Sequence, residues 1–137
     1  MNRINDKMDD IIMFLDELNE ITPEALEEYK SNKEKKAACE RYFEKIIEAV
    51  TDVAFYVIKI KELRIPQDDG DAFEVLKENK IIDDVLSKKL REAKSMRNIL
   101  AHEYGRIDDE IVFESIKEQL TSDIEEFIKQ IKKFLKR

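Results

Sequence analysis

The chain has 137 residues, of which 42% are charged, and it carries a formal net charge of −7. This length can bury a core without cross-links, so we expect one domain spanning residues 1–137. The single cysteine, Cys39, excludes an intrachain disulfide framework and, beside one histidine, a Cys/His zinc site, while the negative charge argues against a protein coated with nucleic acid.

The location of the protein is predicted from what the sequence lacks. No segment approaches the ~18–20 consecutive apolar residues of a membrane span, and the first residues contain no apolar signal-peptide region. A chain without structural disulfides also suits a reducing compartment. We therefore expect a soluble cytoplasmic protein with no membrane association.

The first predicted helix covers about residues 5–19. Its apolar residues recur at spacings of three and four, which draws one stripe along a helix. These residues are Met8, Ile11, Ile12, Leu15 and Leu18. Thr22, Pro23 and Glu24 then combine a capping side chain, a proline suited to the first turn and an acid suited to the helix dipole, which predicts a second helix start.

The second helix is predicted to be long and central. Its polar stretch, residues 30–36, is expected to bend or briefly break it. From Ala37 to about Leu63 the apolar pattern is strong, and it nearly encircles the helix around residues 43–58, which predicts the most buried helix. Pro66 and the following turn residues through Gly70 should end it.

Three further helices are predicted in the second half. Asp71 is expected to cap a short helix, and Asp83 to open a fourth helix that continues toward Leu100 and ends before Gly105. Asp108 should cap the last helix. The predicted inward residues include Val85, Leu86, Leu90, Ala93, Met96, Ile111, Val112, Ile116, Leu120, Ile124 and Phe127. With no strand-like alternation, the chain is predicted to be all-α, an antiparallel helical bundle of about five helices.

Charge is unevenly distributed along the chain. Residues 87–106 contain six basic and two acidic side chains, so this window carries +4 and the rest of the chain carries −11. Such a strip could hold a phosphate backbone at one place on an acidic protein. A solvated helix face with random charge is the plainer alternative.

Residues 97–104, Arg-Asn-Ile-Leu-Ala-His-Glu-Tyr, include the only histidine of the chain. Cleaving RNA without a metal needs a side chain that moves protons near neutral pH, as histidine does, and a cation that stabilises charge on the phosphate. Arginine supplies that cation through its planar fork of donors. The 2′-hydroxyl of RNA is the nucleophile, so Arg97 and His102 suffice as candidate catalytic residues.

The spacing of these two residues imposes a geometric condition. Residues five apart on an unbroken α-helix point about 140° away from each other. Arg97 and His102 therefore converge only if the helix ends between them, or if a second subunit completes the site. Plainer roles are also open: His102 could satisfy the last helix carbonyls, Arg97 could be a surface cation, and Tyr104 could be a buried ring.

The segment 97–104 resembles the R-x-x-x-x-H-x-Y motif of the HepT-like branch of the HEPN proteins. The likeness extends upstream to the amphipathic helix containing Leu86, Leu90 and Met96, and downstream to the acidic helix start and apolar run of residues 107–113. Helix order and chain length also agree, so it spans most of the chain. Residues 92–96 lack the glycine often present in the family, a departure that should affect helix packing more than chemistry.

The resemblance implies a helical homodimer in which two copies of the motif face each other in a cleft at the interface. It implies a metal-independent ribonuclease without a cofactor, acting as the toxin of a HEPN/MNT toxin–antitoxin pair. The implied partner is an MntA-type nucleotidyltransferase antitoxin, which neutralises the toxin by AMPylation of the motif tyrosine. By the same resemblance, Arg97 stabilises the RNA phosphate, His102 transfers protons, Asn98 supports them and Tyr104 accepts AMP.

Other functions stay open at this point. A non-catalytic helical binding partner of a nucleotidyltransferase would use the motif for docking, and a bundle without a site would use it as a helix end. A di-metal bundle is disfavoured because such sites commonly use Glu-x-x-His pairs, and Ile99 stands three residues before His102.

Overall fold

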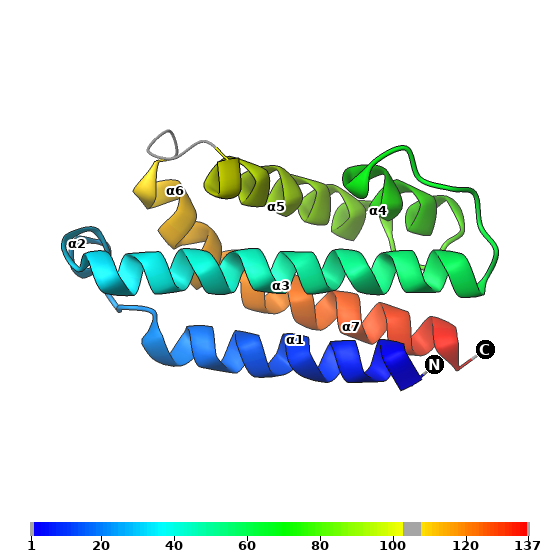
Figure 1. Ribbon diagram of the computed structural model, residues 1–137, viewed down its shortest axis with the longest axis horizontal. Coiled ribbons are helices and arrows are strands. Elements are labelled where there is room, and N and C mark those ends of the chain that lie inside the picture. The colour runs from blue at the N-terminus through cyan, green and yellow to red at the C-terminus, as the bar shows by residue number, and fades with distance from the viewer. Residues whose placement is uncertain (1, 103–107, 137) are drawn as a thin grey trace.

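The computed structural model describes residues 2–102 and 108–136, and over these ranges it is helical, without strands. Figure 1 shows the arrangement of the helices. The helices are α1 (Asn2–Ile21), α2 (Leu26–Ser31), α3 (Lys33–Ile60), α4 (Asp69–Glu78), α5 (Asp84–His102), α6 (Asp109–Glu114) and α7 (Thr121–Leu135). Residues Ser115–Leu120 form a π-helical segment that joins α6 to α7 without a break.

The predicted all-α antiparallel bundle is confirmed for the described residues. Helices α1, α3 and α5 and the α6–α7 segment alternate in direction along the bundle, and the first and last described residues lie at the same end (Figure 1). There are more than five helical segments, because the second helix is divided and the last one contains a π-helical stretch.

Helix α3 is the central helix that the apolar pattern predicts. Of its 28 residues, eleven are buried, in the stretch from Cys39 to Ile58. The expected break in the polar stretch falls at Asn32, whose side chain accepts a hydrogen bond from the Lys35 backbone N–H at 3.0 Å. That cap starts α3 and separates it from the short helix α2.

Two predicted helix starts are wrong. Thr22 does not begin a helix, because its hydroxyl donates to the Leu18 carbonyl at 2.6 Å and so closes the end of α1. Helix α2 begins only at Leu26. Asp68, not Asp71, caps α4, and it accepts from the Asp71 backbone N–H at 2.7 Å. At α4 a neighbouring aspartate takes the cap position, whereas α2 begins after Ala25 without a side-chain cap.

Helix α5 is held by neighbours on several sides. It packs against α3, α4 and α7, with Leu86, Leu90 and Leu100 in the buried cluster that runs through the bundle. Val85 and Ile111, both expected to face inward, are 63% and 54% exposed. None of the helices in the described ranges is both long and apolar enough to cross a membrane.

Candidate functional site

The motif residues lie on the last turns of α5. The helix continues through Arg97 and ends at His102, so it does not end between the two. The first of the two routes by which their side chains could converge is therefore wrong for this chain. Within one copy, Arg97 and His102 point about 140° apart, as expected five residues apart on an α-helix.

Arg97 lies on the inward stripe of α5, seven residues after buried Leu90 and three before buried Leu100. Its side chain is only 18% exposed, and Nη2 donates a short hydrogen bond to the carboxylate of Glu48 on α3. Nη1 donates to the Asn98 side-chain oxygen at 3.3 Å. The plainer interpretation of Arg97 as a freely solvated surface cation is wrong.

Glu48 was not singled out by the sequence analysis. It lies 49 residues before Arg97, on a helix whose other inward positions are mostly apolar, and its side chain is 40% exposed. The only signal available in the sequence was an arginine at an inward position, since such a charge requires a partner. The identity of that partner follows from the packing of α3 against α5.

His102 is exposed and lies in the last turn of α5, where a cation also interacts favourably with the helix dipole. Asn98 is exposed as well and lies four residues earlier, so the two side chains share one face of the helix. The structure thus groups His102 with Asn98 on one face, while Arg97 faces α3.

Tyr104, the predicted AMP acceptor, lies outside the described residues, as does Gly105. The chain is described again from Asp108, whose side chain caps α6 by accepting from the Glu110 backbone N–H at 2.8 Å, as expected. Asp109 then pairs with Lys36 of α3 at 2.9 Å. Both ends of the segment that contains Tyr104 are therefore attached to the bundle, one through α5 and the other through this ion pair.

Three cations in the described part of the basic window, residues 87–102, point to different helices. Lys89 pairs with Asp123 of α7 at 3.5 Å, and Lys94 pairs with Asp69 of α4 at 3.0 Å. Arg97 pairs with α3. Because Lys89, Lys94 and Arg97 face three different helices and each meets a carboxylate there, the charge of these three side chains is distributed around α5.

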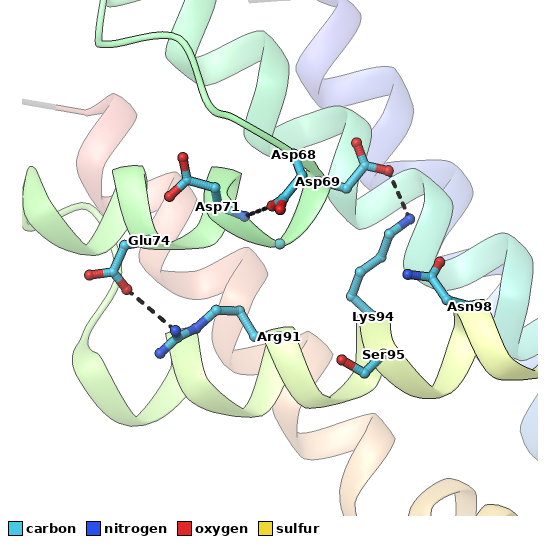
Figure 2. A pocket seen from close by; sticks show the side chains of 9 residues that line it. Asp68, Asp69, Asp71, Glu74, Arg91, Lys94, Ser95 and Asn98 are labelled. Atoms are coloured by element: carbon cyan, nitrogen blue, oxygen red, sulfur yellow. Dashed lines mark hydrogen bonds and ion pairs between the residues drawn. The ribbon is translucent and has the colours of Figure 1, made fainter.

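A polar groove lies between the first turn of α4 and the face of α5 that carries Asn98 (Figure 2). Its volume is about 650 Å³. Helix α5 contributes Arg91, Lys94, Ser95 and Asn98 to it, and the opposite wall is built mostly from acidic residues. The groove therefore adjoins the motif through Asn98.

Comparison with known proteins identifies relatives of this chain. The mRNA nuclease HepT of Shewanella oneidensis is 35% identical over 85 residues, covering 62% of this chain and 63% of that protein, less than two thirds of its length. The tRNA nuclease HepT of Aphanizomenon flos-aquae is 26% identical over 132 residues, covering 96% of this chain and 89% of that protein.

Structural similarity extends over nearly the whole chain. The tri-AMPylated HEPN toxin of Shewanella oneidensis, solved in complex with an MNT antitoxin, superposes with a TM-score of 0.89 at 25% identity, covering 95% of this chain and 96% of that one. The model of the family described as ribonuclease HepT-like matches residues 11–131. The chain therefore belongs to the HepT-like ribonuclease family.

Proposed function

We propose that this chain, as a single HEPN/HepT-like domain over residues 1–137, is the RNA-cleaving toxin of a HEPN/MNT toxin–antitoxin pair acting in the cytoplasm. Its reaction is metal-independent cleavage of an RNA phosphodiester by the neighbouring 2′-hydroxyl. His102 transfers the protons, Arg97 stabilises the charge on the phosphate, and Asn98 supports both. The proposal rests on the family and on the position of these side chains at the end of α5.

One observation carries the catalytic proposal: the arginine of the motif is fixed while the histidine is open to solvent. Glu48 and Asn98 each accept a hydrogen bond from the Arg97 guanidinium, which limits its movement. A pre-oriented cation of this kind stabilises developing charge without reorganising during the reaction. His102, exposed at the helix end, is accessible to the ribose and to the leaving oxygen.

The active form is proposed to be a homodimer. Because α5 is unbroken through the motif, Arg97 and His102 of one copy diverge, and a second copy is needed to bring an arginine and a histidine to the same phosphate. Exposed apolar side chains within and after the motif segment, Ile99 on α5 and Ile111 on α6, suit an interface there. Two-fold symmetry would also supply the second histidine that paired acid and base catalysis uses.

The proposed partner is an MntA-type nucleotidyltransferase that neutralises the toxin by AMPylation of Tyr104. The related Shewanella toxin crystallised in a tri-AMPylated form with its MNT antitoxin, which supports the same pairing for this chain. Phosphates on Tyr104, two residues after His102 in the sequence, would add negative charge to the motif and compete with the RNA.

Purified protein incubated with total RNA, with and without EDTA, tests the proposal. The parent is expected to cleave RNA equally in both conditions, and His102→Ala to slow cleavage by about 100-fold or more, the usual effect of removing a general acid–base residue. Since His102 is exposed, the thermal unfolding of the His102→Ala variant should match that of the parent.

Lys88→Ala is a suitable control, because it removes an exposed side chain on the same helix. If His102→Ala cleaves RNA as fast as the parent, the catalytic role of His102 is wrong. A parent that binds a nucleotidyltransferase tightly but leaves RNA intact would instead establish the alternative, a non-catalytic helical binding partner.

A further inference from the structure

Lys94 of α5 is unusual because it is a buried lysine. Its side chain is only 7% exposed, whereas lysine ammonium groups nearly always remain in water unless they are paired. Its Nζ lies 3.0 Å from Oδ2 of Asp69, whose own side chain is 54% exposed. A buried cation is thus held at the groove by a counterion that is itself half exposed to solvent.

The α5 wall of the groove consists of hydrogen-bond donors in register. Arg91, Lys94, Ser95 and Asn98 stand at positions i, i+3, i+4 and i+7, which places them along one face of the helix (Figure 2). Continuing the same spacing by four residues reaches His102. The groove therefore extends the proposed catalytic face along α5.

The α4 wall is acidic, but its carboxylates have different tasks. Asp68 caps α4, and Asp71 is held by Arg64 at 2.8 Å, so both serve the local structure. Asp69 and Glu74 instead face the α5 cations, at 3.0 Å from Lys94 and 3.6 Å from Arg91. Those two ion pairs cross the groove. An anion can bind to either α5 cation only by replacing the carboxylate that is paired with it.

We propose that this α5 wall binds a phosphodiester of single-stranded RNA further along the strand from the one that is cleaved, with Lys94 as its main contact; this inference rests on the proposed ribonuclease function. Lys94 lies eight residues from His102, about 12 Å along the helix axis. That separation exceeds the distance between consecutive phosphates of one strand, so the groove would hold a phosphate further along the same RNA. The RNA phosphate takes the place of the Asp69 carboxylate on the Lys94 ammonium, and Ser95 and Asn98 donate to its oxygens.

The α5 wall of the groove, in contrast to the acidic α4 wall, favours RNA over a protein partner. Among the described residues that line the groove there is no apolar side chain, whereas protein partners are usually anchored by aromatic or aliphatic side chains in apolar pockets. Cationic and amide donors arranged along a helix suit the repeated oxygens of a phosphate backbone.

If an RNA phosphate replaces Asp69 on Lys94, substitutions of these two residues should change the RNA affinity in opposite directions. Lys94→Gln removes the phosphate contact and should weaken RNA binding about tenfold, as expected for loss of a charge-assisted hydrogen bond. Asp69→Asn removes the competing carboxylate and should tighten binding about threefold, since a half-exposed ion pair contributes little. A pair that only stabilises the fold would not produce this difference in sign.

The probe is a fluorescent 2′-O-methyl RNA oligonucleotide, which cannot be cleaved because its 2′-oxygen is blocked, with Kd measured by anisotropy over a range of salt concentrations. For Lys94→Gln, the slope of log Kd against log salt should fall by about 0.7, the value for one contact to a single strand. Lys89→Gln and Asp123→Asn are matched controls. In the parent, Lys89 and Asp123 form a 3.5 Å ion pair on the side of α5 that faces α7, away from the groove. Both variants should leave Kd within twofold of the parent.

Gly70→Leu tests the groove without changing charge. A Cβ added at Gly70 would meet only Oδ1 of Asp68, at an ordinary contact distance of 3.6 Å, so a side chain is tolerated there. Because Gly70 lines the groove, the leucine should narrow it and weaken RNA binding severalfold, with thermal unfolding near that of the parent.

Each outcome is decisive. Unchanged Kd for Lys94→Gln, Asp69→Asn and Gly70→Leu, with a parent that still cleaves RNA, would overturn the groove assignment and leave the ribonuclease intact. Variants that keep their RNA affinity but lose affinity for the nucleotidyltransferase would overturn it in favour of a protein-docking surface. If the parent neither binds the oligonucleotide nor cleaves RNA, the proposed function fails and this inference fails with it.

Discussion

A guanidinium that lies against the core needs a partner for its charge, and in this chain Glu48 provides it. Removing one partner of such a pair leaves the other charge desolvated and unpaired, which costs more than the loss of the contact itself. Arg97 is mostly buried and Glu48 is partly exposed, so water can compensate only in part. The pair thus stabilises the packing of α5 on α3 and also fixes the residue proposed to hold the RNA phosphate.

We expect Glu48→Ala to lower the free energy of unfolding by about 1–2 kcal/mol, because it leaves Arg97 without its carboxylate. Asp52→Ala is the matched control, since Asp52 lies one turn further along α3 and pairs with Lys7 at 3.5 Å in a more exposed setting. That change should cost less than about 0.5 kcal/mol. Chemical denaturation of both variants measures the two values, and equal losses would contradict the role of Glu48 as the partner of a buried charge.

Individual residues differed in how well the sequence predicted them. Arg97 and His102 are candidates from their chemistry and from the family motif, and Asn98 from the motif alone; all three lie at the end of α5, and their roles stay predictions. Lys94 and Glu48 were not predicted, because burial of a lysine and pairing across 49 residues depend on how helices pack. Local patterns contain little information of that kind.

At the level of helices, the long periodic segments were predicted best. The stripes of α1, α3, α5 and α7 each span several turns, so an error at one position does not change the prediction. Helix ends depend on single hydrogen bonds, and for that reason Thr22 and Asp71 were assigned wrongly as caps. The π-helical segment Ser115–Leu120 was not predicted, because Ile116, Leu120 and Ile124 recur every four residues, a spacing that an α-helix also accommodates.

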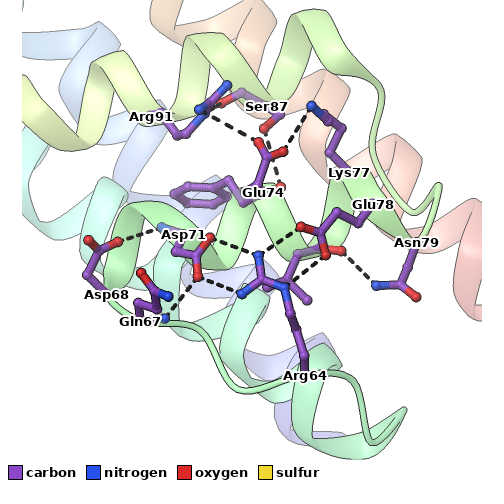
Figure 3. Close-up of polar contacts among 12 residues, drawn as sticks. Arg64, Gln67, Asp68, Asp71, Glu74, Lys77, Glu78, Asn79, Ser87 and Arg91 are labelled. Atoms are coloured by element: carbon purple, nitrogen blue, oxygen red, sulfur yellow. Dashed lines mark hydrogen bonds and ion pairs between the residues drawn. The ribbon is translucent and has the colours of Figure 1, made fainter.

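The connection from α3 to α4 is held by Arg64 (Figure 3). Its guanidinium donates two hydrogen bonds to Asp71 and two to Glu78, at 2.8–2.9 Å. Hydrogen bonding to Arg64 lowers the pKa of Asp71 to about 2 and also lowers the pKa of Glu78. One side chain thereby connects the loop before α4 to both ends of that helix.

This cluster predicts a pH-dependent contribution to stability. Because the folded-state pKa values of both carboxyls are lowered, their contribution is fully present above the unfolded values near 4 and is lost as pH falls toward 2. Arg64→Gln removes this stabilising contribution of the two carboxylates. The difference in Tm between parent and variant should therefore be largest above pH 5 and should shrink between pH 4 and pH 2.

Thermal unfolding of the parent and Arg64→Gln across this pH range measures the effect. Burial raises the pKa of Glu40 and of Asp123, so these two carboxyls change the stability in the opposite direction as pH falls. Both are present in the parent and in the variant, so their effect cancels in the Tm difference. Lys35→Gln, which breaks a single exposed pair with Glu28 at 3.4 Å, should follow the parent at every pH. A Tm difference that stays constant down to pH 2 would contradict the assignment.

The whole molecule raises the question of how many copies form one site. Figure 1 shows α5 running straight to its end at one side of the bundle, with α6 beginning beside it. A continuous helix cannot direct Arg97 and His102 to one phosphate. If two copies meet at this end, the arginine of one and the histidine of the other form each site, and every dimer contains two such sites.

Mixing two inactive variants tests this arrangement directly. Arg97→Ala and His102→Ala should each abolish cleavage alone. In a mixed dimer, one of the two sites receives Arg97 from one copy and His102 from the other and is intact, while the second site lacks both. Random exchange makes half of the dimers mixed, so about a quarter of the parent activity should return. Sites built within one copy would stay inactive in every combination, because each copy lacks one of the two residues, and the absence of any recovered cleavage after verified subunit exchange would exclude a site shared between copies.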